Sequence, residues 1–401
     1  MPRLIADRPV LHTSSDLGRV MEAARAREKP GERVLHLERG EPDFDTPPHI
    51  VEALAAAARD GYTHYPHERG EPALREALAV KLARENRIEA HADDITISAG
   101  GTHALYLSIQ CVLGAGDELL VCSPHWMAVP KMVGLAAGAL YRSFPLYLEL
   151  QSGAWSAAEL ADRLRAAVRP NTRALYLNTP NNPTGVVLSR EQLQAIATVA
   201  IERDLVVLSD EAYEHLTYDG ATHVSIASLP GMAERTLSVF SFSKSYAMTG
   251  WRVGYVVSPP ALRKVMAPLL AFYTSHGVFP SVQRAALAAV TGPQDAVAHM
   301  RASYDERRRS LIDGLAGSTN VRAAAPTGAF YAFANVAAAR GSRDLWALVD
   351  DWMAFGVAVL PGTAFGPEYG DWVRLALCTR AEDVAEAARR IAHYAGTGVR
   401  S

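Results

Sequence analysis

Lys244 is the residue of this chain best suited to covalent chemistry. Lysine stands only at positions 29, 81, 131, 244 and 264, although Lys and Arg together number 40, so arginine supplies most of the positive charge. A lysine amine can lose its proton and add to a carbonyl as a Schiff base, whereas a guanidinium stays charged. Ser241, Ser243 and Ser245 surround Lys244, and Arg252 follows. These neighbours suit a phosphate anchored beside an imine, although a surface lysine in a serine-rich turn explains this motif alone equally well.

A second motif, Ser98-Ala-Gly-Gly-Thr102, stands between a predicted strand and a predicted helix. Gly100 and Gly101 let the backbone approach a ligand closely, and Thr102 with the first helical amides can bind an anion. The motif also fits a tight connection that binds nothing. It is neither G-x-G-x-x-G nor a P-loop, so it does not imply a nucleotide.

Further polar and aromatic side chains follow predicted strands. The turn Asn178-Thr-Pro-Asn-Asn-Pro-Thr-Gly185 is stiffened by its prolines, so an asparagine amide in it can donate a directed hydrogen bond. Asp210 comes just after the apolar run 205–208 and is either a helix cap or the partner of a protonated ring nitrogen. Tyr213 offers a phenol nearby, and Trp126 either packs in the core or stacks on a flat ring.

Together these residues meet the demands of pyridoxal phosphate. A lysine forms an imine, an aspartate keeps a pyridine nitrogen protonated, and an asparagine with a tyrosine bonds a phenolate oxygen. An aromatic side chain stacks on the ring, while glycines, serines and an arginine hold the phosphate. Because the pyridinium of this cofactor stabilises a carbanion, the combination predicts a pyridoxal-phosphate enzyme.

The elements that must position these residues form an alternation of apolar strands and amphipathic helices from Asp94 onward. We expect strands at 95–97, 119–122, 140–144, 174–177, 205–208, 237–240 and 253–257, with helices at 102–113, 126–136, 157–168 and 190–203. Strands buried on both faces and separated by such helices indicate an α/β fold with a mostly parallel central sheet. Ligands in such sheets bind at the carboxyl ends of the strands, where these motifs fall.

The length of 401 residues suggests two domains. We expect a large cofactor-binding domain at 45–280 and a smaller α+β domain formed by 1–44 together with 281–401. Predicted helices outside the alternation begin at Ser15, span 48–61, and pass through Leu74, Leu78 and Leu82. Beyond Pro280 we expect helices at 293–315, 342–355 and 381–394 and strands at 329–334 and 372–377.

Composition narrows the class of protein. The net charge of −3 argues against a nucleic-acid binder with a broad basic surface. Cys111, Cys122 and Cys378 are widely spaced and fit neither a disulfide framework nor a zinc site, so we expect no metal and a reducing compartment. Met1–Asp7 lacks the apolar run of a signal peptide, and no stretch reaches the length of a membrane span. We therefore expect a cytoplasmic protein that does not bind membranes.

Four motifs give the chain a wider resemblance: Gly40-Glu-Pro-Asp-Phe44, Asn181-Asn-Pro-Thr-Gly185, Asp210-Glu-Ala-Tyr213 and Ser243-Lys-Ser-Tyr-Ala-Met-Thr-Gly-Trp-Arg252. From Val34 to Cys378 the chain resembles the class I pyridoxal-phosphate aminotransferases of fold type I, above all the aspartate, aromatic and alanine aminotransferase group. The resemblance implies transfer of an amino group between an L-amino acid and a 2-oxo acid by ping-pong half-reactions.

The resemblance also implies a role for each matching residue. Lys244 would form the Schiff base and carry the proton at the substrate Cα, and Asp210 would pair with the pyridine nitrogen. Asn182 and Tyr213 would bond the ring hydroxylate, lowering the proton affinity of the imine, and Trp126 would stack on the ring. The residues around the phosphate would be Gly101, Thr102, Ser241 and Arg252, with Tyr65 reaching in from a second subunit.

The same resemblance implies a site for the substrate carboxylate. Arg374 would grip that carboxylate with two hydrogen bonds, and Gly40 would lie close to it. Because Tyr65 would serve the neighbouring site, a homodimer is implied. Arg374 could instead be a strand residue paired with an acidic side chain, and Tyr65 could be an aromatic side chain packed in a histidine-rich loop.

Substrate choice stays open at this stage. No position matches the second arginine that grips the distal carboxylate of a dicarboxylic substrate, which puts strict aspartate specificity in doubt. His103, His125 and His276 stand in segments that vary with substrate in this family, but they could be solvated or packed. A lyase or a specialised biosynthetic enzyme would share Lys244 and Asp210. A DNA-binding regulator of similar fold is disfavoured, because the segment before Gly40 is too short for its DNA-binding module.

Overall fold

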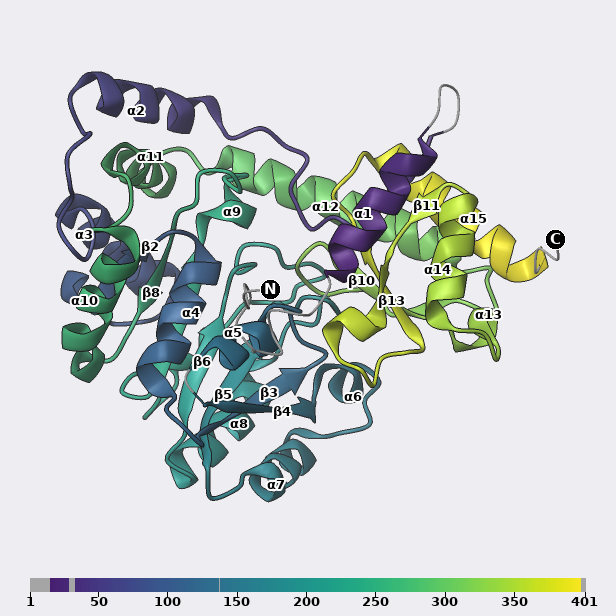
Figure 1. The fold of residues 1–401 in the computed structure, drawn as a ribbon, viewed down its shortest axis with the longest axis horizontal. Helices are drawn as coiled ribbons and strands as arrows, with labels where there is room; N and C mark the ends of the chain where they lie inside the picture. The colour runs from purple at the N-terminus through teal and green to yellow at the C-terminus, as the bar shows by residue number, and fades with distance from the viewer. Residues whose placement is uncertain (1–14, 29–32, 137, 398–401) are drawn as a thin grey trace, which may run out of the picture.

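The computed structural model describes residues 15–28, 33–136 and 138–397, and the described part forms two groups of elements (Figure 1). One group is built on a large sheet and the other on a smaller sheet at the yellow, C-terminal end of the colour scale. The prediction for Met1–Asp7 concerns residues outside the described ranges. None of the helices in these ranges is long and apolar enough to cross a membrane.

In the described part of the chain, the large sheet has seven strands in the order β2-β8-β7-β6-β5-β3-β4. Their bounds are β2 Ile95–Ser98, β3 Glu118–Ser123, β4 Leu140–Pro145, β5 Thr172–Asn178, β6 Val206–Asp210, β7 Thr236–Ser241 and β8 Gly254–Val257. Strands β4, β3, β5, β6 and β7 run parallel, and β8 pairs antiparallel with both β7 and β2. The predicted α/β fold with a mostly parallel sheet is confirmed.

Helices cover both faces of this sheet, which explains why its strands are apolar throughout. Leu119 and Val121 of β3 pack with one set of helices, whereas the alternating residues Leu120 and Cys122 pack with another. The first set is α4 Gly101–Val112, α5 Val129–Leu135 and α10 Arg263–Thr274. The opposite face carries α6 Tyr147–Gln151, α7 Ala157–Ala167 and α8 Arg190–Glu202 at one end, and α2 Pro48–Arg59, α3 Pro72–Lys81 and α11 Pro280–Thr291 at the other.

The smaller group of elements joins the two ends of the chain. Its four-stranded antiparallel sheet has the order β12-β13-β10-β9 within the described residues. The strands are β9 Arg322–Ala323, β10 Tyr331–Asn335, β12 Leu360–Pro361 and β13 Trp372–Ala376, and β1 Leu35–His36 pairs in parallel with β11 Val357–Ala358. The helices are α1 Asp16–Arg27, α12 Asp295–Leu315, α13 Ala337–Arg340, α14 Leu345–Ala354 and α15 Ala381–Thr397. Most of these elements share one core, and α1 packs against β11 and β12.

Two predicted helices differ from the structure, and two further helices were not predicted. The helix expected from Trp126 begins at Val129, because Pro130 favours the first turn of a helix and Trp126 lies in the preceding turn. Helices α10 and α11 were not predicted. Helix α10 contains Pro268, and a proline at that position usually indicates the end of a helix. The helix expected through Leu82 ends as α3 at Lys81 and continues as the short π-helical turn Leu82–Asn86.

Candidate active site

The carboxyl ends of several neighbouring strands surround a cavity of about 150 Å³. Asn178, Asp210 and Ser241 are the last residues of β5, β6 and β7, and Gly101 is the first residue of α4. Nine of the predicted site residues line this cavity, namely Gly101, Thr102, Trp126, Asn182, Asp210, Tyr213, Ser241, Lys244 and Arg252. The parallel strands therefore bring together motifs that lie far apart in the sequence.

Lys244 lies in the short helix α9, Phe242–Ser245, which begins immediately after β7. Ser241 caps this helix, since its side-chain oxygen accepts a hydrogen bond from the Ser243 N–H at 3.2 Å. The Lys244 amine donates a hydrogen bond to the carbonyl oxygen of Gly40 at 2.7 Å. Burial lowers the pKa of the Lys244 amine, which increases the fraction of the neutral, nucleophilic form.

Asp210 is a buried carboxylate at the end of β6. Its Oδ2 accepts a hydrogen bond from the Tyr176 hydroxyl at 3.0 Å, and its Oδ1 accepts one from the Ala212 N–H at 3.3 Å. Burial raises the pKa of Asp210 to about 6, although both hydrogen bonds act in the opposite direction. A protonated pyridine nitrogen in the cavity would supply the cation that this carboxylate lacks, so Asp210 fits pyridoxal phosphate.

The opposite end of the cavity fits a phosphate. Gly100 has φ +88°, and a Cβ built on it would lie 2.6 Å from Nη2 of Arg252. Arg252 itself has φ +55° and donates from Nη1 to the carbonyl oxygen of Thr249 at 2.7 Å. The guanidinium therefore lies against the backbone that leads into α4, where unpaired helical N–H groups favour an anion. Glycine is needed at 100 both for the left-handed backbone and for this close approach.

Arg374 lies beside the cavity rather than in its lining. It is buried in β13, where Nη1 donates to Oδ1 of Asn182 at 3.2 Å and Nη2 donates to the carbonyl oxygen of Glu38 at 2.5 Å. Its Nε has no hydrogen-bond partner among the described residues. Of the two alternatives left by the sequence, pairing with an acidic side chain is not seen in the described part of the chain, because Arg374 bonds an amide and a carbonyl.

Tyr65 does not line the cavity of its own chain. Tyr65 is 76% exposed, and its ring centroid lies 4.8 Å from that of His276. His103 accepts a hydrogen bond at Nδ1 from the Ala99 N–H at 3.2 Å, and His125 is buried with Nδ1 3.2 Å from the carbonyl oxygen of Trp126. His125 is buried, whereas His103 is partly buried with its ring centroid 6.4 Å from that of Tyr273, and neither is among the described residues that line the cavity.

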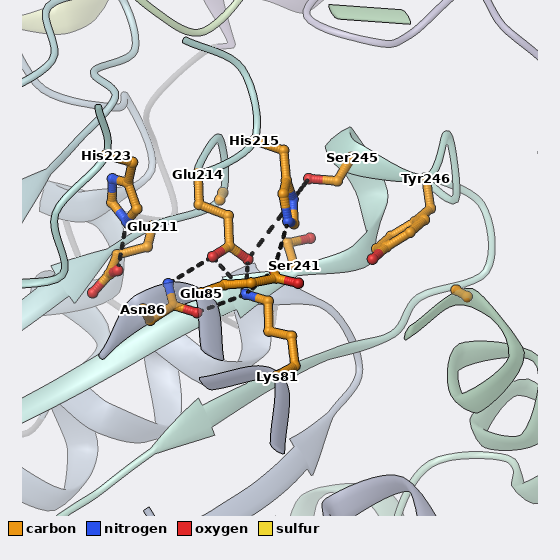
Figure 2. Close-up of polar contacts among 12 residues, drawn as sticks. Lys81, Glu85, Asn86, Glu211, Glu214, His215, His223, Ser241, Ser245 and Tyr246 are labelled. Atoms are coloured by element: carbon orange, nitrogen blue, oxygen red, sulfur yellow. Dashed lines mark hydrogen bonds and ion pairs between the residues drawn. The ribbon is translucent and has the colours of Figure 1, made fainter. Parts of the chain in front are cut away.

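A polar network contacts α9 through Ser245 (Figure 2). Lys81 donates hydrogen bonds to both carboxylate oxygens of Glu214 at 2.6 Å, and its ammonium lies 4.9 Å from the Phe240 ring centroid. His215 lies between Ser245 and Glu85, with nitrogen–oxygen distances of 2.8 and 3.2 Å. Because Ser245 follows Lys244 directly, this network supports the helix that carries the lysine.

Several residues near the cavity were not singled out from the sequence. Asn178, Ala212, Ser243 and Thr249 line it, and all four stand in motifs quoted from the sequence, although none was assigned a role. Tyr176 holds Asp210, and Tyr331 and Phe365 flank Arg374 with ring centroids 4.5 and 5.1 Å from the guanidinium carbon. No local signal marks these three aromatic residues, because their contacts depend on how distant strands and turns meet.

Comparisons with known proteins agree with this geometry. Residues 32–391 match the family described as aminotransferase class I and II. The chain is 36% identical over 400 residues to an aspartate aminotransferase of Geobacillus stearothermophilus, covering 97% of this chain and 98% of that protein. It is 40% identical over 371 residues to an arginine–pyruvate transaminase of Pseudomonas aeruginosa, covering 92% of each.

Solved structures give the same result. The aspartate aminotransferase of Thermus thermophilus with maleate superposes with a TM-score of 0.89 at 36% identity, covering 98% of this chain and all (100%) of that one. The aromatic aminotransferase of Pyrococcus horikoshii gives a TM-score of 0.85 at 36% identity, covering 93% and 98%. Since similarity of sequence and of fold extends over nearly the full length of these relatives, the chain belongs to the class I and II aminotransferase family, whose members use pyridoxal 5′-phosphate to transfer amino groups.

Proposed function

We propose that this aminotransferase performs its chemistry at Lys244 and binds the substrate α-carboxylate at Arg374. The observation that carries the proposal is the buried guanidinium of Arg374, whose Nε has no partner among the described residues while Asn182 and Glu38 fix its other nitrogens. A carboxylate can satisfy such a planar group with two parallel hydrogen bonds. The Lys244 amine donates to the carbonyl of Gly40, and Arg374 donates to the carbonyl of Glu38, two residues earlier. The lysine and the arginine therefore contact the same segment.

The remaining residues have distinct tasks in this proposal. When bound, pyridoxal phosphate supplies a carbonyl that condenses with amines and a pyridinium that withdraws electrons from the substrate Cα. Asp210 holds the proton on the pyridine nitrogen, and Lys244 moves a proton at the substrate Cα. The Asn182 amide nitrogen would be left to donate to the ring oxygen of the bound cofactor, because Arg374 occupies its Oδ1. Trp126 lines the cavity and would stack on the ring and exclude water.

The phosphate group has its own proposed contacts. Gly101, Thr102, Ser241 and Arg252 line the end of the cavity next to the N-terminus of α4. Their hydroxyls, backbone N–H groups and guanidinium are the donors that a phosphate requires. Anchoring a charged group that does not react would hold the ring in one orientation while amino donors exchange.

A half-reaction panel tests the function and names the donor. The holoenzyme is mixed with one amino acid at a time without any oxo acid, and the absorbance of the bound cofactor is followed together with release of the 2-oxo acid. Aspartate and arginine are tested first, because one relative is named as an aspartate aminotransferase and another as an arginine–pyruvate transaminase. For the true amino donor, we expect release of one molecule of 2-oxo acid per active site. Release of ammonia without a stable change of the cofactor would instead indicate a lyase.

We also propose a homodimer with shared active sites. Tyr65, Phe272, Tyr273 and Phe279 expose 76, 82, 46 and 49% of their surface. The loop that holds Tyr65 contacts the segment after α10, since Tyr65 lies against His276 and a Cβ on Gly277 would lie 3.2 Å from Pro66. An exposed aromatic surface of this kind favours burial against another protein, here a second copy.

Mixing two inactivating variants tests whether the active site is shared between subunits. Dimers of Lys244→Ala lack the amine, and dimers of Tyr65→Ala lack the residue proposed to cross the interface. If Tyr65 serves the neighbouring site, a mixed dimer contains one site with both residues, and activity rises on mixing and exchange. Activity equal to the average of the two variants would contradict sharing, and a monomeric mass in sedimentation would contradict the dimer itself.

Two broader predictions remain part of the proposal. The division into a large domain at 45–280 and a small domain from the two ends remains a proposal: separate cores around the two sheets support two domains, but α11 beyond Pro280 packs in a core of the large sheet. A cytoplasmic location is supported by Cys111, Cys122 and Cys378, none of which forms a disulfide, as expected in a reducing compartment. Fractionation of the source cells tests the location, and limited proteolysis tests the division.

A further inference from the structure

Tyr331 occupies a central position that no sequence motif indicated. It is the first residue of β10 and is 1% exposed. Phe333, two residues later in β10, lies opposite Arg374 in β13. Side chains two residues apart in a strand share a face of the sheet, as do cross-strand partners. The register therefore places Tyr331 on the same face as Arg374, diagonally across the strand pair.

The ring of Tyr331 fixes one side of Arg374. The guanidinium carbon lies 4.5 Å from the Tyr331 ring centroid and 5.1 Å from that of Phe365, at the end of the 3₁₀ turn Gly362–Phe365. Two aromatic rings against a guanidinium restrict the orientation of its plane. This plane decides where the unpartnered Nε points, and so where a carboxylate can bind.

The hydroxyl of Tyr331 meets two other site residues. Its oxygen lies 3.1 Å from the hydroxyl oxygen of Tyr213, which lines the cavity. It also fills the space above Gly40, because a Cβ built on Gly40 would lie 2.1 Å from it. A single buried side chain thus contacts the proposed carboxylate anchor, the phenol proposed to face the cofactor, and the residue that accepts the Lys244 hydrogen bond.

We propose that Tyr331 is a positioning residue whose hydroxyl donates a hydrogen bond to the Tyr213 oxygen, so that the single Tyr213 proton is directed into the cavity. The inference rests on the roles proposed above for Tyr213 and Arg374. It adds that these two roles are set by one residue, through its hydroxyl for Tyr213 and through its ring for Arg374.

The direction of this hydrogen bond follows from the surroundings. Tyr213 lines the cavity, where a ring oxygen would accept its proton, whereas Tyr331 faces Arg374 and Gly40. Burial raises the pKa of Tyr331 to about 12, with the Arg374 cation acting against it, and raises that of Tyr213 well above the usual range. The phenol beside the cation is the better donor.

Tyr331→Phe tests the hydroxyl alone, because the ring and its contact with Arg374 remain. Without the hydrogen bond from Tyr331, the Tyr213 hydroxyl would donate a weaker hydrogen bond to the cofactor's ring oxygen. That oxygen would then become more basic. We expect the pH midpoint of the bound cofactor's absorption to rise by roughly half a unit, the effect of losing part of one hydrogen bond. We expect kcat to fall about fivefold to tenfold and the amino-acid KM to change less than about twofold.

Tyr304→Phe is the matched control. Tyr304 is a fully buried tyrosine of the same core, its ring centroid lies 5.1 Å from that of Phe330, and its hydroxyl has no hydrogen-bond partner among the described residues. Loss of its hydroxyl should leave the absorption midpoint and kcat unchanged. An equal midpoint shift in both variants would overturn the inference, because it would reflect a general loosening of the core.

Tyr213→Phe separates this inference from the roles on which it rests. That variant should show a midpoint shift at least as large, and Tyr213→Phe with Tyr331→Phe should add nothing to it. A shift in Tyr213→Phe but none in Tyr331→Phe would overturn the inference alone. No shift in Tyr213→Phe would overturn the proposed role of Tyr213 and the inference with it.

Discussion

The amine of Lys244 donates a hydrogen bond across 2.7 Å to the carbonyl oxygen of Gly40, a residue 204 positions earlier in the chain. The lysine lies in α9, directly after strand β7 of the large sheet, whereas Gly40 follows the strand that pairs with β11 of the smaller group. The hydrogen bond therefore couples the proposed nucleophile to the segment on which the carboxylate anchor also rests, since Arg374 donates to the carbonyl of Glu38. The variants below test the charges around this contact.

Replacing Lys244 by alanine should remove both binding of the cofactor carbonyl and proton transfer. We expect turnover to fall at least about 10⁴-fold, because no other described residue that lines the cavity carries a side-chain amine. Borohydride reduction followed by mass spectrometry checks the covalent bond directly. Lys264→Ala, which changes an exposed lysine, should keep the adduct and the activity. A covalent adduct on the Lys244→Ala chain would refute the assignment.

Replacing Arg374 by alanine should weaken binding of the amino acid. A charged hydrogen-bonded pair contributes about 1.5–3 kcal/mol, so KM should rise roughly 10- to 150-fold. Arg374→Lys should recover only part of this loss, because an ammonium lacks the planar fork. Arg322→Ala changes an exposed arginine of the same sheet and should leave KM unchanged. An unaltered KM in Arg374→Ala would mean that the carboxylate binds elsewhere.

Asp210 should make the stability of the cofactor-free protein depend on pH. Its pKa rises from 3.8 to about 6 on folding, so between these values the folded chain holds a proton that the unfolded chain releases. The stability this adds is present at low pH and is lost as pH rises through about 6, amounting to about 2–3 kcal/mol. Urea unfolding of cofactor-free wild type and Asp210→Asn at pH 4.5 and 7.5 measures it. Equal pH dependence in the two proteins would contradict the raised pKa.

Through its ion pair with Glu214, Lys81 should stabilise the polar network that contacts α9. The two side chains are 5 and 10% exposed, so removal of one charge leaves the other buried without its partner. We expect Lys81→Met to lower the free energy of unfolding by about 3–5 kcal/mol. Adding Glu214→Gln should restore part of the loss, and Lys264→Met should have no effect. A double variant as unstable as Lys81→Met would show that burial of Glu214 is not the cause.

Much of the fold could be predicted from short-range patterns. The apolar run Leu205–Leu208 predicts a strand buried on both faces, and the structure has β6 there with Asp210 at its end. The same reasoning located the turns at Gly101 and Ser241, because a parallel sheet exposes only the ends of its strands to a ligand. Local apolarity and strand ends are properties of neighbouring residues, so one sequence suffices to detect them.

The contacts that refine the site could not be predicted in this way. Tyr331 meets Arg374 only because β10 and β13 pair with Phe333 opposite Arg374, and nothing in either strand specifies that register. Tyr176 reaches Asp210 across two adjacent strands for the same reason. Helix α10 was missed because Pro268 stands inside it, where a proline normally ends a helix.

The pairing of β1 with β11 also has a consequence for how the chain is made. Leu35 donates its backbone hydrogen bond to Gly356, and Leu37 donates to Ala358, so the partner of this early strand emerges from the ribosome more than 300 residues later. The strands of the large sheet are all synthesised before β11, and their contacts span shorter stretches of chain. During synthesis the large sheet can form first, while β1 still lacks its hydrogen-bonding partner β11. We therefore expect the contact between Lys244 and Gly40 to be among the last to become permanent, so that a nascent chain would acquire the proposed catalytic geometry only near the end of translation.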